Sequence, residues 1–206
     1  MNGLKPAVIR DLGRRPMPDV WAQMQSFTMG RTADTADEIW FVEHPPVFTL
    51  GMRADRSHLL APGDIPVVQI DRGGQVTYHG PGQLVVYVLL DLQRLELNVR
   101  SLVQTLELAV IETVAAYGVT AKGRRDAPGV YVDGKKLAAI GLRVRRNCSY
   151  HGLAVNVSMD LTPFKRIHPC GFEDLEVTQL AEVCDVDDPA RFRADFEPRL
   201  LARLYG

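Results

Sequence analysis

The hydrophobic pattern of the chain switches between helical and strand-like spacing, which predicts a mixed α/β protein. Apolar residues recur at three- and four-residue intervals between Asn98 and Gly118, so a long amphipathic helix is expected there, capped by Asn98 and ended by Gly118. Two further helices are expected at 19–31 and 189–204. Short apolar runs of strand length occupy residues 7–12, 38–43, 47–50, 67–70 and 83–90.

A β-hairpin is expected in the second half of the chain. The apolar segments 130–132 and 137–144 flank Asp133-Gly134, a dipeptide that readily adopts the positive φ angles of a two-residue turn. Another strand is expected at 153–157, and no internal repeat or linker divides the chain. Residues 1–206 are therefore expected to form a single α/β domain, with a mixed, hairpin-rich β-sheet flanked by helices.

Composition and charge narrow the classes of partner. The 206 residues are 46% hydrophobic, which is enough for a sizeable core, and 24 basic and 25 acidic residues give a formal net charge of −1. This balance provides no overall field for nucleic acid or a membrane surface. The longest strongly apolar run, Leu84–Leu90, is too short for a bilayer span, and the first residues lack an apolar signal core. We therefore expect a cytoplasmic protein.

Two groups of residues partly match known binding motifs. Gly129–Lys136 (GVYVDGKK) fits seven positions of a P-loop, but Lys136 stands where that motif has serine or threonine. Cys148, His151, His168 and Cys170 carry the right atoms for tetrahedral zinc, but their spacing is not a usual zinc pattern. We therefore expect no P-loop, no metal and no cofactor.

The three cysteines differ in their surroundings. Their odd number, with no export signal, argues against a disulfide framework. Cys184 lies among acidic residues that would raise its pKa, and Cys148 lies in a turn that offers little to orient a substrate. Cys170 lies between a proline and a glycine, near three basic residues, Lys165, Arg166 and His168. On this pattern alone, reactive and structural roles for Cys170 are equally open.

A reactive thiolate needs a cationic or basic partner, and the hairpin offers one. Counting alternation from Asp133-Gly134 places Lys136 on the apolar strand face with Ala138, Ile140, Leu142 and Val144, and Lys135 on the arginine-bearing face. A lysine against an apolar wall loses hydration, which lowers its pKa and allows proton exchange near neutrality. The alternative, that both lysines only solubilise the hairpin tip, remains open from this pattern.

Four motifs in a fixed order carry a resemblance to a known family. They are RGGQVTYHGPGQ at Arg72–Gln83, GVYVDGKKLAAIG at Gly129–Gly141, HGLAVNV at His151–Val157 and PCG at Pro169–Gly171. With these motifs, between about Glu43 and Gln179, the chain resembles the lipoyl(octanoyl) transferase family, also called lipoate-protein ligase B. The resemblance implies the fold of biotin and lipoate protein ligases. It also implies an acyltransferase that moves an octanoyl group from octanoyl-acyl carrier protein to a lysine on lipoyl domains of 2-oxoacid dehydrogenase and glycine-cleavage proteins.

The same resemblance implies roles for individual residues. The family's acyl-carrying cysteine falls on Cys170, and the lysine that lowers the pKa of that cysteine falls on Lys136. The sequence departs from the family at His168, where asparagine is more often expected. Substrate contacts fall on Arg72, Gly73, Gly74, Gln75, Val76, Thr77, Tyr78, His79, Ala139, Ile140, Gly141, Gly152, Leu153 and Ala154.

Further expectations concern the walls of the site and its partners. Five apolar side chains are candidates for the walls of an alkyl slot: Val76, Tyr78, Leu137, Ile140 and Leu153. Six basic residues are candidates for a patch that meets an acidic carrier: Arg72, Arg143, Arg145, Arg146, Lys165 and Arg166.

Three alternative functions remain to be weighed. An ATP-dependent lipoate or biotin protein ligase would share the fold but needs a nucleotide site. A thioester hydrolase would pair Cys170 with His79, His151 or His168. A non-catalytic binding module would not use the thiol at all.

Overall fold

A mixed β-sheet forms the centre of the computed structural model, which describes residues 5–206 except for the side chain of Cys170. Within these residues the sheet has seven strands in the order β1-β2-β6-β10-β9-β8-β7. Only β1 and β2 pair in parallel, and the other neighbours are antiparallel. The strands are β1 (Val8–Arg14), β2 (Glu38–Glu43), β6 (Gln83–Leu89), β10 (Cys148–Asn156), β9 (Lys135–Arg145), β8 (Gly129–Val132) and β7 (Lys122–Gly123).

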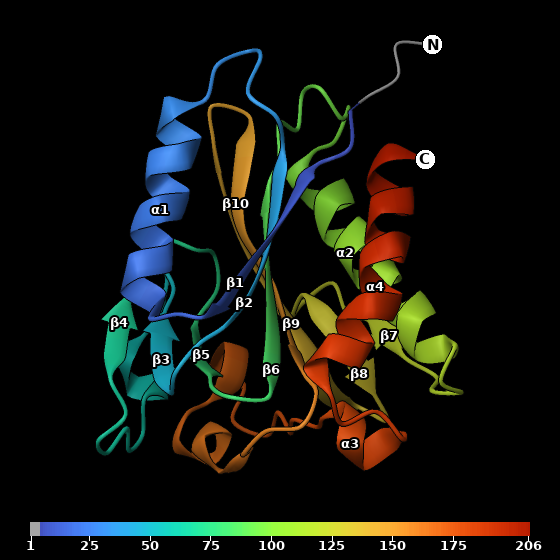
Figure 1. The fold of residues 1–206 in the computed structure, drawn as a ribbon. Helices are drawn as coiled ribbons and strands as arrows, with labels where there is room; N and C mark the ends of the chain where they lie inside the picture. The colour runs from blue at the N-terminus through green and yellow to red at the C-terminus, as the bar shows by residue number, and fades with distance from the viewer. Residues whose placement is uncertain (1–4) are drawn as a thin grey trace.

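A second, smaller sheet lies beside the lower end of α1 (Figure 1). Its order is β4-β3-β5, with β3 (Val47–Leu50) parallel to β4 (Val67–Gln69) and antiparallel to β5 (Val76–His79). The sequence pattern did not predict β5, because glycines crowd both of its ends and leave only four residues in which alternation could be read.

Helices cover both faces of the large sheet (Figure 1). α1 (Met17–Gly30) lies on one face, and α2 (Val99–Ala115) and α4 (Pro189–Tyr205) lie on the other. The predicted cap of α2 is confirmed, because the Asn98 side chain accepts from Ser101 N and the Ser101 side chain accepts from Asn98 N. The shorter elements are α3 (Leu180–Val183) and the 3-10 turns η1 (Arg56–His58), η2 (Thr162–Arg166) and η3 (Pro169–Gly171). No helix among the described residues is long and apolar enough to cross a membrane.

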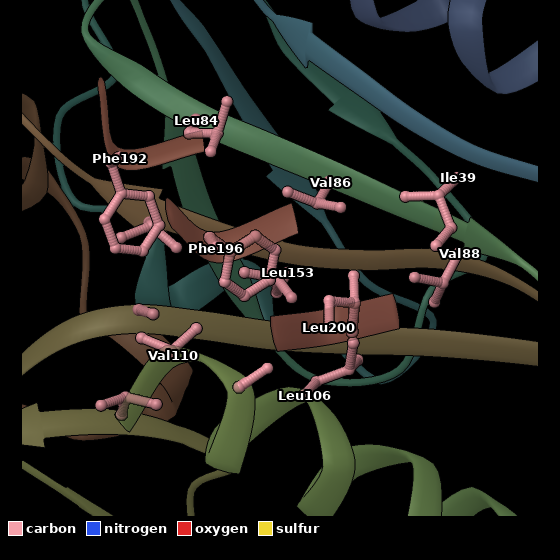
Figure 2. Close-up of a cluster of buried hydrophobic side chains, with 14 of the residues drawn as sticks. Ile39, Leu84, Val86, Val88, Leu106, Val110, Leu153, Phe192, Phe196 and Leu200 are labelled. Carbon is pink, nitrogen blue, oxygen red and sulfur yellow. The ribbon is translucent and has the colours of Figure 1, made fainter. Parts of the chain in front are cut away.

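The largest apolar cluster lies between the sheet and the α2–α4 pair (Figure 2). Phe192 and Phe196 of α4 stack with ring centroids 5.6 Å apart, and both are fully buried. Burying each such side chain contributes about 1.5–3 kcal/mol. The same cluster contains the strand residues Ile39, Leu84, Val86, Val88 and Leu153. The mixed, helix-flanked α/β fold predicted from the sequence is therefore confirmed.

The hairpin forms as predicted, but its strand β9 contains a bulge. Asp133 and Gly134 have φ angles of 48° and 84°, as a two-residue turn requires, so Gly129–Lys136 is a strand and turn rather than a P-loop. Val130 pairs with Ala138 and Tyr131 pairs with Lys136, which leaves Leu137 as an extra residue. The bulge reverses the alternation, so the prediction that Lys136 shares a face with Ala138 and Ile140 is wrong.

Candidate active site

A cavity of about 260 Å³ lies on the α1 side of the large sheet. Its floor is formed by β9 and β10, where Ala139 pairs with Ala154 and Gly141 pairs with Gly152. Segment 72–77 and His79 form a wall, and the loop 126–128 closes one border. The cavity gathers all of the predicted substrate-binding residues except Tyr78: Arg72, Gly73, Gly74, Gln75, Val76, Thr77, His79, Ala139, Ile140, Gly141, Gly152, Leu153 and Ala154.

Tyr78 and Leu137, two of the expected walls of the alkyl slot, lie elsewhere. The Tyr78 ring packs between Phe48 and Phe164, with centroid distances of 5.4 and 5.5 Å. Leu137 belongs to the core beneath α2 and α4. Tyr78 and Val76 both pack into the apolar cluster that contains Phe48 and Phe164. Thr77 and His79 alternate with them along β5 and line the cavity. The sequence did not single out Met17, Val85 and Tyr87, which complete the lining from α1 and β6.

Arg72 is buried in the cavity wall, where its side chain forms hydrogen bonds with Thr49 and Gly73. Its Nη2 donates to the Thr49 carbonyl at 2.7 Å and to Thr49 Oγ1 at 2.9 Å, and its Nη1 donates to the Gly73 carbonyl at 3.0 Å. The arginine stem crosses Gly141, where a Cβ would lie 3.0 Å from Arg72 Cδ. Because Gly141 has no Cβ, the Arg72 side chain can pack directly against β9, which forms part of the cavity floor.

The basic residues expected to form one patch differ in their burial. Arg72 is buried, and Arg143 is half-buried with its Nη1 at 3.0 Å from Met52 Sδ. Arg145 and Arg146 are exposed at the end of β9 opposite Lys136, roughly 30 Å away along the strand at about 3.3 Å per residue. Arg72 therefore cannot belong to an exposed patch, and a patch formed by the other five basic residues stays a prediction.

Burial keeps the histidine His79 neutral. Gln83 Nε2 donates to Asn156 Oδ1, so Gln83 Oε1 is an acceptor and His79 Nδ1 donates to it at 2.7 Å. Burial, together with the positive charge of neighbouring groups, lowers the pKa of His79 to about 3. A ring with so low a pKa is a weak base at neutral pH.

A second buried histidine, His151, is fixed by Asp71. His151 Nε2 lies 2.9 Å from Asp71 Oδ1, and the same carboxylate accepts from Trp21 Nε1 at 2.7 Å and from the Tyr150 hydroxyl. Burial opposes ionisation of Asp71, but these hydrogen bonds outweigh it and hold the pKa of that carboxyl below its usual range. His151 has a φ of +59°, a left-handed conformation that is uncommon for a residue with a side chain. Asp71 lies directly before the first motif, and the sequence analysis missed it.

Lys136 is buried next to Pro128, one of the residues that line the cavity, with 3% of its surface exposed. Its Nζ donates to the Pro128 carbonyl at 3.2 Å and lies 5.3 Å from the centre of the Tyr131 ring. The bulge at Leu137 turns this lysine onto the face of Ala139, which is the cavity face. Gly129 opposite has no Cβ, and a Cβ there would lie 3.0 Å from Lys136 Cε. By contrast, Lys135 is exposed and pairs with Glu176 at 2.7 Å.

The PCG segment forms the turn η3 against the cavity wall. Gly171 has a φ of +80°, and its N donates to the His168 carbonyl at 3.0 Å. A Cβ at Gly171 would lie 3.3 Å from Cγ of Gln75, which lines the cavity, and 3.2 Å from His58 Nε2. His168, the position at which the sequence departs from the family, is half-buried, and its ring centroid lies 5.8 Å from that of His58. The side chain of Cys170 lies outside the described residues, so its pairing with Lys136 stays a prediction.

The other two cysteines are unsuited to nucleophilic attack. Cys148 begins β10 and is buried, so the expectation that it lies in a solvated turn is wrong. Burial raises the pKa of the Cys148 thiol and of the half-buried Cys184 thiol.

Comparison with known proteins agrees with this geometry. The chain matches the lipoyl protein ligase A/B catalytic domain over residues 17–204. It is 58% identical over 195 residues to the octanoyltransferase of Pseudomonas fluorescens strain SBW25, covering 95% of this chain and 89% of that protein. It is 57% identical over 200 residues to the octanoyltransferase of Alkalilimnicola ehrlichii, covering 96% and 93%.

Solved structures share the fold at much lower identity. The bipartite lipoate protein ligase of Thermoplasma acidophilum aligns with a TM-score of 0.78 at 16% identity, over 97% of this chain and 84% of that one. Biotin protein ligase from Aquifex aeolicus aligns with a TM-score of 0.56 at 14% identity, over 98% and 69%. From the family match and the close relatives together, the chain belongs to the lipoyl protein ligase A/B catalytic domain family, as an octanoyltransferase-type enzyme of the transferase class.

Proposed function

We propose that this enzyme moves an octanoyl group from octanoyl-acyl carrier protein to a lysine on lipoyl domains, through a thioester on Cys170. The acceptors would be the lipoyl domains of 2-oxoacid dehydrogenase and glycine-cleavage proteins. The observation that carries the proposal is the buried Lys136, which borders a cavity lined by the family motifs. The PCG turn lies against Gln75 in the wall of the same cavity.

The reaction is a double exchange at one carbonyl carbon. The Cys170 thiolate attacks the donor thioester, the new C–S bond forms, and the carrier's thiolate leaves and takes a proton. The amine of the acceptor lysine then attacks the octanoyl-Cys170 thioester, the C–S bond breaks, and an amide forms with loss of one proton from the amine. The first step exchanges one thioester for another, and the second forms a more stable amide, so the sequence runs without ATP.

Lys136 would act in both steps. As an ammonium it stabilises the Cys170 thiolate, because opposite charges attract strongly where water is excluded. As an amine it accepts the proton that the acceptor lysine loses. The Pro128 carbonyl and the Tyr131 ring hold its head group at the cavity border.

The cavity supplies the selection for the acyl chain. Seven methylene and methyl groups buried at about 0.8 kcal/mol each correspond to roughly 5–6 kcal/mol of gross transfer free energy. Met17, Val85 and Ala154, which belong to the apolar cluster on the α1 side of the sheet, provide apolar lining for such a chain.

The alternative functions receive less support. Of the three histidines considered as the base of a cysteine–histidine hydrolase, His79 has a pKa of about 3, which makes it a poor base at neutral pH. His151 is tied to Asp71, and burial lowers its pKa as well. An ATP-dependent ligase shares the fold, but the relatives that are 58% and 57% identical to this chain are octanoyltransferases.

Intact-mass analysis tests the proposal directly. The enzyme is incubated with octanoyl-acyl carrier protein, without ATP, and then with a lipoyl domain. We expect one octanoyl adduct on the enzyme, which disappears as the lipoyl domain gains the same mass. Cys170→Ala should abolish adduct and transfer, whereas the matched variants Cys148→Ala and Cys184→Ala should retain both. An adduct that persists in Cys170→Ala would end the assignment, and release of free octanoate without an acceptor would favour the hydrolase.

A further inference from the structure

A chain of buried hydrogen bonds runs from the cavity wall to the neighbourhood of Lys136. It begins at His79 Nδ1, which donates to Gln83 Oε1 at 2.7 Å. Gln83 Nε2 donates to Asn156 Oδ1 at 2.9 Å, and Asn156 Nδ2 donates to the Thr178 carbonyl at 3.0 Å. Gln83, Asn156 and Thr178 are 2%, 4% and 3% exposed. Buried amides of this kind are costly when unpaired and hold their partners firmly when paired.

Asn156 lies where β10 stops pairing with β9 and the segment 176–178 takes its place beside β9. β10 pairs with β9 as far as Val155 and Ala138. Beyond that point the segment 176–178 lies beside β9, where Lys136 and Val177 form a parallel bridge. Asn156 is the next residue of β10, and its side chain reaches across this junction to Thr178. The Asn156 amide therefore links the end of β10 to the segment that lies beside Lys136.

The segment 176–178 fixes the backbone of Lys136 from both sides. Lys136 N donates to the Glu176 carbonyl at 2.8 Å, and Thr178 N donates to the Lys136 carbonyl at 3.0 Å. The same segment follows η3 after the short stretch 172–175, so its placement also limits where the PCG turn ends. On the other side of that turn, His168 N donates to the His58 carbonyl at 2.9 Å.

We infer that Asn156 is a positioning residue for the transfer reaction. By holding Thr178, it sets the backbone of Lys136 and one end of the segment that carries Cys170, and so the approach of the two reacting side chains. Gln83 fixes the orientation of the Asn156 amide, because its own amide nitrogen donates to Asn156 Oδ1 and leaves Nδ2 for Thr178. This role rests on the proposed functions of Cys170 and Lys136.

Two substitutions separate positioning from simple packing. Asn156→Leu keeps the approximate volume and removes both hydrogen bonds. Asn156→Asp keeps the shape and the acceptor for Gln83, but places a carboxylate oxygen against the Thr178 carbonyl. Ser149→Ala is the matched control, because it removes a buried side chain of the same strand that donates to the Val88 carbonyl at 2.7 Å and accepts from Leu90 N at 3.2 Å.

The readouts are steady-state transfer and the pH dependence of Cys170 alkylation by iodoacetamide, both corrected for folded protein by circular dichroism. We expect both Asn156 variants to lower kcat by about tenfold to a hundredfold, the range that follows from small misplacements of reacting groups. The KM for the octanoyl donor should stay unchanged, because the cavity lining is intact. The alkylation midpoint of Cys170 should rise, and Ser149→Ala should alter neither readout.

The outcomes distinguish this inference from the proposed function. If folded Asn156→Leu and Asn156→Asp keep the wild-type kcat and alkylation curve, the positioning role is overturned while octanoyl transfer stands. If the wild-type enzyme forms no octanoyl adduct, the proposed function fails instead. The alkylation curves then still decide whether Asn156 governs the environment of Cys170, since alkylation needs no acyl substrate.

Discussion

The two faces of the large sheet differ in the kind of side chain that they bury. Beneath α2 and α4 the buried contacts are mainly apolar, with Phe192 and Phe196 packed among aliphatic strand residues. On the α1 side the sheet buries an arginine, a lysine and histidines, including Arg72, Lys136 and His79. Burying polar groups costs free energy unless each finds a partner. The same face also buries an apolar cluster that includes Met24 and Trp40. The α1 face therefore combines apolar packing with the cavity and its buried polar groups, whereas the α2–α4 face contributes mainly packing.

The largest effect is expected at Lys136. Lys136→Met keeps most of the side-chain bulk and removes the amine, so octanoyl transfer should fall by about 10²–10⁴-fold, the usual contribution of a general acid or base. Thermal unfolding should change little, because a buried charge is removed together with its desolvation cost. The control is Lys135→Met on the adjacent, exposed lysine, which should transfer at the wild-type rate. Equal losses of transfer activity in Lys136→Met and Lys135→Met would show that Lys136 has no special role.

The opposite outcome is expected beneath the helices. Phe196→Ala opens a cavity in the apolar cluster, so the free energy of unfolding should fall by about 3–5 kcal/mol, measured by urea denaturation. Transfer per folded molecule should be unchanged, because Phe196 lies on the face opposite the cavity. A variant with normal stability and reduced kcat would contradict the division between the two faces.

The pH dependence of stability should report the buried histidine. Burial lowers the pKa of His79 from 6.5 to about 3, so the unfolded state binds one more proton between these two values. Stability should therefore fall as pH decreases through that window, with a contribution from His79 of about 1.4 kcal/mol per pH unit at most. Urea denaturation at several pH values should show a shallower fall for His79→Gln. An unchanged slope would mean that His79 is not buried in its neutral form.

The smallest effects are expected for substitutions of two glycines of the hairpin, Gly134 and Gly129. Gly134 has a φ of +84° and open space around it, so Gly134→Ala should cost about 1 kcal/mol of stability and leave transfer unchanged. Gly129→Ala adds a Cβ 2.2 Å from the Ala138 carbonyl oxygen and 3.0 Å from Lys136 Cε. It should therefore lower both stability and kcat. Both variants are checked by urea denaturation and by the transfer assay. A Gly129→Ala enzyme with the wild-type kcat would show that the contact between Gly129 and Lys136 does not matter for transfer.

The hydrophobic pattern of the sequence predicted the elements beneath α2 and α4 well. The residues of the cavity side were predicted only through the motifs. Periodicity is enough where apolar residues meet helices, as in α2 with its Asn98 cap. It failed at Leu137, because an unpaired residue in a strand leaves no mark on the hydrophobic pattern. It also missed Asp71 and Asn156, since a buried polar residue can be recognised only once its partners, distant along the chain, are known. The motif resemblance brought the cavity residues together, and the structure separated Tyr78 from them.

Activation of Cys170 by Lys136 can be measured as the alkylation rate of Cys170 at a series of pH values. The rate of reaction with iodoacetamide follows the thiolate fraction, so the wild-type midpoint should lie well below the ordinary thiol pKa of about 8.5. In Lys136→Met the midpoint should move up towards that ordinary value, while Lys135→Met and His79→Gln should keep the wild-type curve. If Lys136→Met leaves the curve in place and His79→Gln shifts it, the partner of Cys170 is a histidine and the account of Lys136 is wrong.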